Sequence, residues 1–117
     1  MAKVTGLAHI TIKGVRVHSE KGATLEVGGK VGKSAVSTSG FVGTYTDEIK
    51  PGKITFSIIH TDKDDLTVYQ NLRDEPVTFE TDSGQTYLIN RAATVGDVKL
   101  KGNTFEIEME GDPAELL

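Results

Sequence analysis

Apolar and polar side chains alternate along most of this chain, which is the pattern of β-strands that bury one face. The clearest example is segment 104–110, in which Phe105, Ile107 and Met109 alternate with glutamates. Successive side chains of a strand point to opposite faces, so the apolar residues can enter a core while the carboxylates share one polar surface. We therefore expect this segment to be a strand with an acidic face.

The same alternation predicts further strands. Lys13-Gly14 and Asp82-Ser83-Gly84-Gln85 have the composition of tight turns, and each joins two alternating runs. By contrast, residues 30–40 are small, polar and bounded by glycine, so they are expected to form a long flexible loop or a weak exposed hairpin, mobile in the isolated protein. The expected strands are 9–12, 15–17, 24–27, 41–46, 53–61, 77–81, 86–89, 94–100 and 104–110.

One helix is expected between residue 62 and Pro76. Asp62 or Asp64 can cap its N-terminus, and acidic residues in the first turn favour the helix dipole. The run Asp62-Lys63-Asp64-Asp65 vaguely suggests a calcium loop, but helix capping explains it better. The expected apolar stripe of the helix is formed by Leu66, Val68, Tyr69 and Leu72.

Together these elements predict a mainly β fold, a β-sandwich or roll of two packed antiparallel sheets that carries one α-helix. The chain has 117 residues, of which 37% are hydrophobic, so a single domain over residues 1–117 with one modest core is expected. The expected core comprises Phe56, Ile58, Phe79, Phe105 and Ile107, with Leu66, Tyr69 and Leu72 from the helix.

Charge is distributed unevenly. Residues 1–46 hold six Lys or Arg and two Asp or Glu, whereas residues 47–117 hold seven and fifteen, which gives about +4 and −8. Such polarity suits copies that meet front to back. A nucleic-acid binder would instead be expected to gather its basic residues into one patch.

A second strand also carries carboxylates on one face. Glu80 and Asp82 are expected to lie opposite Val77 and Phe79 on segment 77–82. Acidic strand faces have two interpretations, an ordinary solvated sheet surface or a surface that prevents a polyanion from binding.

No pattern of catalytic or cofactor-binding residues is present. The chain has no cysteine, which excludes disulfides and thiolate chemistry. The segment 28–34 imitates a phosphate-binding loop, but Val27 stands where the first glycine is required and no helix is expected after it. His9, His18 and His60 lie on separate segments without metal-ligand spacing. We expect no enzymatic activity, no cofactor and no metal.

Nothing in the sequence predicts a membrane segment. No apolar run approaches the roughly 20 residues that cross a bilayer, and Met1-Ala2-Lys3-Val4-Thr5 lacks the apolar centre of a signal peptide. We expect a soluble protein made in the cytoplasm.

The order and spacing of several short features extend over nearly the whole chain. They are Gly14-Val15, Leu25-Glu26-Val27-Gly28-Gly29, Val42-Gly43-Thr44-Tyr45, Lys50-Pro51-Gly52-Lys53-Ile54, the helix with Leu66 and Leu72, Thr81-Asp82-Ser83-Gly84-Gln85-Thr86-Tyr87, Arg91-Ala92-Ala93 and Glu110-Gly111-Asp112-Pro113-Ala114-Glu115. In this arrangement the chain resembles the tail tube proteins of Mu-like contractile-tailed bacteriophages.

The resemblance implies a structural subunit of hexameric rings that stack into a tube inside a contractile sheath. One sheet of each subunit would join its neighbours in a closed barrel, whose acidic lumen would conduct DNA without sequence-specific binding. Expected partners are further copies, the tail sheath protein, and tape measure protein or DNA in the lumen, in a virion tail assembled in the host cytoplasm.

The resemblance also assigns roles to residues. The candidate lumen-facing residues are Glu80, Asp82, Glu106, Glu108 and Glu110, with strand 104–110 slightly favoured. The candidates for an inter-ring contact are Lys30, Val31, Gly32, Lys33, Ser34, Ser37, Thr38 and Ser39.

Two other functions remain open at this point. The tube protein of a phage-like bacteriocin or contractile secretion particle would share the architecture and differ in what passes through it. A monomeric β-sandwich that binds a sugar or a protein would need an exposed aromatic platform, and the sequence has no aromatic cluster outside core spacing.

Overall fold

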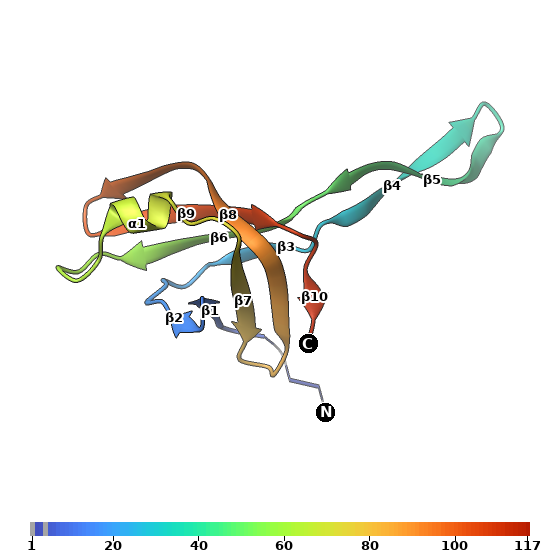
Figure 1. Cartoon of the computed structure of the whole chain (residues 1–117). Helices are drawn as coiled ribbons and strands as arrows, with labels where there is room; N and C mark the ends of the chain where they lie inside the picture. Colours follow the sequence, from blue (N-terminus) through green and yellow to red (C-terminus); the bar gives the residue numbers. More distant parts are fainter. Residues whose placement is uncertain (1, 4) are drawn as a thin grey trace.

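Antiparallel strands make up most of the computed structural model, which describes residues 2–3 and 5–117 (Figure 1). Met1 and Val4, in the stretch expected to lack a signal peptide, lie outside the described residues. The elements are β1 (Ala8–Ile12), β2 (Val15–Arg16), β3 (Thr24–Glu26), β4 (Gly29–Ser37), β5 (Gly40–Lys50), β6 (Gly52–Ile59), α1 (Leu66–Gln70), β7 (Glu75–Thr81), β8 (Thr86–Lys101), β9 (Thr104–Gly111) and β10 (Glu115–Leu116).

The long strand β8 connects two antiparallel sheets. Its first half pairs with β7 and its second half with β9, in the overall order β2-β1-β7-β8-β9-β6-β3, and β10 pairs with β8 as well. We call β1, β2, β7, β10 and the first half of β8 the first sheet, and the second half of β8 with β9, β6 and β3 the second sheet. The predicted class, two antiparallel sheets with one helix, is confirmed.

Strand β8 corrects the expectation of separate strands at 86–89 and 94–100. The chain continues through Asn90 and Arg91, and Arg91 adopts a positive φ of 53° at the passage between the sheets. A single left-handed residue bends a strand without ending it. The sequence predicted two strands because an interruption of the alternation does not distinguish a bend from an end.

The core lies between the two sheets. All eight predicted core residues belong to one apolar cluster, Leu66 and Tyr69 as partly buried members. The first sheet adds Ile10, Ile12, Val77 and Ile89, and the second adds Ile54 and Met109. Phe105 contacts the Tyr69 ring at a centroid distance of 5.2 Å, which ties the helix to the second sheet.

Helix α1 is shorter than expected and begins at a different cap. Asp65 is the N-cap, and its side chain accepts hydrogen bonds from the Thr67 amide and hydroxyl, which lower the pKa of Asp65. Asp64 instead accepts a hydrogen bond from the Thr61 amide in the preceding turn. The predicted caps Asp62 and Asp64, and acidic residues in the first turn, are therefore wrong. Val68 is 57% exposed, so it does not belong to the buried stripe.

The helix is held against an irregular part of β8. Between Val95 and Lys99 the ladder with β9 is interrupted. There the Gln70 side chain donates to the Gly96 carbonyl and accepts from the Val98 amide, at 2.9 and 2.8 Å. The side chain thus satisfies two backbone groups that β9 does not pair.

Strands β4 and β5 form a long hairpin that projects away from both sheets (Figure 1). Of the two alternatives for residues 30–40, the exposed hairpin is therefore confirmed and the loop is wrong. The expected strand 41–46 also extends to 40–50. Its apolar side chains have no core to enter, and Val36 and Phe41, directly opposite each other, are 70% and 69% exposed.

The base of the hairpin is tightly packed. A Cβ atom on Gly28 would lie 2.5 Å from the Pro51 carbonyl carbon, and one on Gly52 would lie 2.6 Å from the Asp112 oxygen. The Ala114 amide donates to the Val27 carbonyl at 2.8 Å. Only glycine permits these approaches, so the C-terminal segment fixes the direction in which the hairpin leaves the sheets.

Replacing Phe105 with Ala should destabilise the fold by about 3–5 kcal/mol, because its ring is 1% exposed and its removal leaves a cavity. The matched control is Phe41→Ala, at an exposed ring on the hairpin, which should change the free energy of unfolding by less than about 0.5 kcal/mol. Urea denaturation measures both. Equal effects of the two substitutions would show that the strand register is wrong.

Candidate functional site

The outer face of the second sheet carries the glutamates of β9. Glu106, Glu108 and Glu110 lie opposite Ser57, Thr55 and Lys53 of β6. The Lys53 ammonium lies 3.8 Å from the Glu108 carboxylate, a loose and partly exposed ion pair. Since β9 lies inside the sheet, these carboxylates form a line along its middle.

Lysines border this acidic line. On one side of the line, Lys99 of β8 lies opposite Glu106. On the other side, Lys53 of β6 separates the line from Glu26 of β3, which lies opposite Lys53. The face is therefore acidic along β9 and mixed at its edges. The sequence pattern revealed the acidic line, but it did not reveal the lysines, because they come from strands whose pairing was unknown.

Glu80 and Asp82 do not lie on this face. Glu80 belongs to β7 in the first sheet, where its carboxylate pairs with Arg16 at 3.0 Å. Asp82 follows β7 in the turn, so its expected position on the strand face is wrong. The two predicted acidic sets lie in different sheets and do not form one surface.

The Asp82 carboxylate binds the N-terminal segment. Its two oxygens accept hydrogen bonds from the backbone amides of Gly6 and Leu7, each at 2.9 Å. These bonds favour the ionised form and lower the pKa of Asp82. Asp82 therefore has a structural partner within the chain.

The β4–β5 hairpin is the second candidate contact region, and all eight predicted inter-ring residues lie on it or in its turn. Residues 34–46, its outer part, contain no charged side chain. Lys33 pairs with Asp47 at 3.4 Å just below this part. Sequence reasoning did not identify Phe41 and Val42 as contact candidates. They could have been found, because two apolar residues directly after a polar turn indicate an exposed apolar surface.

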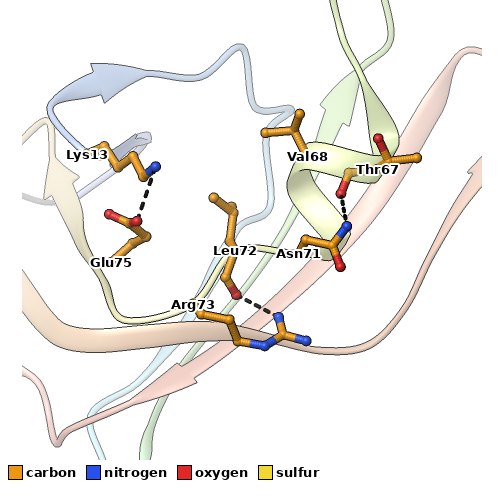
Figure 2. A pocket seen from close by; sticks show the side chains of 7 residues that line it. All are labelled: Lys13, Thr67, Val68, Asn71, Leu72, Arg73 and Glu75. Carbon is orange, nitrogen blue, oxygen red and sulfur yellow. Dashed lines mark hydrogen bonds and ion pairs between the residues drawn. The ribbon is translucent and has the colours of Figure 1, made fainter.

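The cavity in Figure 2, about 370 Å³, lies between α1, β7 and the β1–β2 turn. Its polar groups pair with each other: Lys13 with Glu75 at 3.1 Å, and Arg73 with the Leu72 carbonyl at 2.7 Å. A ligand site usually offers convergent unpaired polar groups, and this cavity does not favour one. Within residues 2–3 and 5–117, no cluster of three or more potential metal ligands forms and no helix could span a membrane.

The sequence matches a known family. The sequence model of the family described as phage tail tube protein covers residues 1–115. No curated protein matches the chain.

The fold is similar to chains of contractile particles solved by cryo-EM. The sheath/tube terminator of an extracellular contractile injection system (PVC), in its extended state, has a TM-score of 0.71, with 9% identity and coverage of 100% of this chain and 97% of that one. The anti-feeding prophage cap (AFP tube terminating cap) has a TM-score of 0.68, with 8% identity and coverage of 100% and 94%. The PVC sheath-tube complex, also extended, has a TM-score of 0.68, with 9% identity and coverage of 100% and 91%. At these identities the likeness concerns the fold.

Substitution of Asp82 by Asn should loosen residues 6 and 7, because a neutral amide accepts their hydrogen bonds more weakly than a carboxylate. In the wild type, protonation of Asp82 at low pH should loosen residues 6 and 7 for the same reason. The folded-state pKa lies below the ordinary value, so the contact stabilises the fold above that value and is lost as the pH falls through the folded pKa. Backbone ¹⁵N relaxation of Gly6 and Leu7 measures both effects.

The matched control for this test is Asp62→Asn, at an exposed aspartate that makes no hydrogen bond within the described residues. It should leave the relaxation of Gly6 and Leu7 unchanged at neutral pH. Unchanged order in Asp82→Asn as well would show that the carboxylate does not hold the segment.

Proposed function

This chain belongs to the phage tail tube protein family, and we propose that it is the subunit of a tube built from stacked hexameric rings, which conducts DNA during ejection. The observation that carries the proposal is the family match over residues 1–115, on a fold whose second sheet has open edges and whose β4–β5 hairpin projects from both sheets. The function is structural, and the proposal includes no catalysis. The chain is proposed to act as one tail tube domain over residues 1–117.

The second sheet is proposed to line the channel. It contributes four strands, and joining its edges to those of neighbouring copies would close a barrel and remove exposed edges. Six copies would turn each glutamate of β9 into a ring of negative charge. Such rings repel phosphates over about a Debye length, roughly 8 Å at physiological salt, so DNA could slide without binding.

The β4–β5 hairpin is proposed to contact the next ring. It leaves the sheets at a fixed angle, carries exposed Val36, Phe41 and Val42, and has an uncharged outer part. These exposed apolar side chains would gain stability when another copy covers them. If the hairpin is mobile in the isolated subunit, this contact would make it rigid.

Partners and location follow from the tube. The sheath protein would surround it, tape measure protein or DNA would occupy its lumen, and the subunit would assemble in the host cytoplasm into a virion tail. Membership of the family supports this proposal.

A second candidate is the tube or tube terminator of a contractile injection or bacteriocin particle. The observation that favours it is the fold similarity to the PVC and AFP structures, two of which are a terminator and a terminating cap. A monomeric binding module is less favoured. Such a module would need an exposed aromatic platform, and the hairpin does not form one from Phe41 and Tyr45. These residues lie opposite Val36 and Lys33 of β4, which are three residues apart, so the two rings point to opposite faces.

Negative-stain microscopy at rising protein concentration tests the assembly. The wild-type chain should form rings or tubes, whereas a variant in which residues 31–48 are replaced by Asn-Gly should stay a folded monomer, because the inter-ring contact is gone. Circular dichroism checks the fold. Tubes of normal length from the shortened variant would contradict the role of the hairpin, and a wild type that stays monomeric at all concentrations would contradict the proposed function.

Replacing Glu106 and Glu108 with Lys should permit assembly but slow genome release, because the lumen would then attract phosphates. DNA retained in contracted tails measures the effect. The control pair, Asp62→Lys with Glu115→Lys, makes the same charge change away from β9 and should release DNA normally. Normal ejection at low salt by the Glu106/Glu108 variant would contradict a lumen lined by β9.

A further inference from the structure

The second sheet has two open edges, and one of them is largely covered by the helix. On β8 the Thr94 amide donates to the Leu72 carbonyl at 3.2 Å. Gln70 occupies the Gly96 carbonyl and the Val98 amide. Residues 94–98 are therefore unavailable to another strand, and only Lys99, Leu100 and Lys101 remain as an open edge.

The opposite edge contains β3, which is also three residues long, and residues 18–20, which bond to the far end of β6. Neighbouring strands in the order β8-β9-β6-β3 are all antiparallel, so β3 runs opposite to the second half of β8. Copies related by rotation would consequently present antiparallel strands to each other. Strand β3 and the open part of β8 match in length and direction.

The backbone groups of the two edges also match. The Ser57 carbonyl accepts from Glu20, and the Ile59 amide donates to His18, so odd-numbered residues of β6 bond towards β3. Leu25 lies opposite Ile54, an even-numbered residue, and its N–H and C=O must point to the open edge.

The same reasoning applies to Leu100. Because the Thr94 amide points away from β9, its partner Met109 bonds towards β6. Phe105, four residues from Met109, has the same orientation. Leu100, opposite Phe105, therefore turns its N–H and C=O outwards.

We propose that β3 of one copy pairs with residues 99–101 of the next, in the register Glu26 to Lys99, Leu25 to Leu100 and Thr24 to Lys101. Leu25 and Leu100 would exchange two backbone hydrogen bonds, which are the ones that each edge leaves open. The inference rests on the proposed assembly and specifies which edges join within a ring and which charges select the register.

Side chains on both faces support this register. Glu26 and Lys99 share the polar face, and neither makes an ion pair within residues 2–3 and 5–117. Leu25 and Leu100 lie on the core side, opposite Ile54 and Phe105, and Leu100 is 46% exposed. The junction would thus pair opposite charges on one face and cover an apolar side chain on the other.

Neighbouring registers with the same faces are worse. A shift of two residues towards α1 places Glu26 opposite Asp97, a like charge in the segment that Gln70 covers. A shift of two residues the other way places Leu25 opposite Gly102 in the β8–β9 turn and Leu100 opposite Val27, which lies beyond β3 and whose carbonyl already accepts from the Ala114 amide. The proposed register alone keeps both the ion pair and the leucine pair.

Charge reversal tests the ion pair. Glu26→Lys alone and Lys99→Glu alone should each raise the concentration needed for assembly by about five- to tenfold, because like charges opposite each other destabilise a sheet. The double variant Glu26→Lys/Lys99→Glu should recover near-normal assembly in sedimentation and microscopy. Each reversal also places a like charge opposite Lys53 or Glu106 within the subunit, so thermal melting should show the native fold at a somewhat lower melting temperature in all three variants. Recovery of assembly in the double variant alone therefore reports the contact between copies.

Cysteine cross-linking tests the register itself, on a chain with no native cysteine. Leu25→Cys/Leu100→Cys should give a ladder of disulfide-linked oligomers after assembly and oxidation, since Cα atoms of a hydrogen-bonded pair lie about 5.5 Å apart. The control Leu25→Cys/Lys99→Cys places the thiols on opposite faces and should not give one.

Three results would each overturn this junction while leaving the proposed tube intact, provided that the wild type assembles. They are normal assembly of the single charge variants, no recovery of assembly in the double charge variant, and cross-linking of the Leu25→Cys/Lys99→Cys control as strong as that of the Leu25→Cys/Leu100→Cys variant. A wild type that forms neither rings nor tubes would overturn both the junction and the proposed function.

Discussion

The structure depends on burial of alternating apolar side chains between two sheets that share one bent strand. Strand β8 passes from the first sheet to the second at Arg91, where its buried positions change from Ile89 to Ala92 and Thr94. Both sheets therefore turn their apolar faces inwards, and Val77, Ile89, Phe105 and Ile107 meet in one core. Every polar face is then directed outwards. The position of the β9 glutamates follows from the packing of their apolar neighbours rather than from any interaction of the carboxylates.

The same constraint leaves three features without partners inside one copy. The hairpin extends beyond the core, the edge of β3 is open, and β8 is open only where α1 ends its cover. Unpaired edges and exposed apolar residues are costly on a monomer. In the proposed tube, other copies would cover the hairpin and pair with the two edges. The edges would thus join subunits within a ring, and the hairpin would join one ring to the next.

The sequence predicted the fold class and the core because alternation directly records which side of a strand is buried, as for Phe105 and Ile107. It did not predict strand pairing, and therefore could not decide whether Glu80 and Asp82 share a sheet with the β9 glutamates. Glu80 lies in the other sheet and Asp82 in the turn after it. The sequence also chose the wrong helix cap, since Asp62, Asp64 and Asp65 differ only in local geometry. The lysine border and the matching edges required the register of the ladders.

The central claim is that the second sheet lines the tube. Helical reconstruction by cryo-EM of tubes assembled from the wild-type chain tests it most directly, because it shows which sheet faces the lumen. The account predicts Glu106 and Glu108 on the inner wall, with the Arg16–Glu80 pair of the first sheet on another surface. A tube whose inner wall is formed by the first sheet would contradict it.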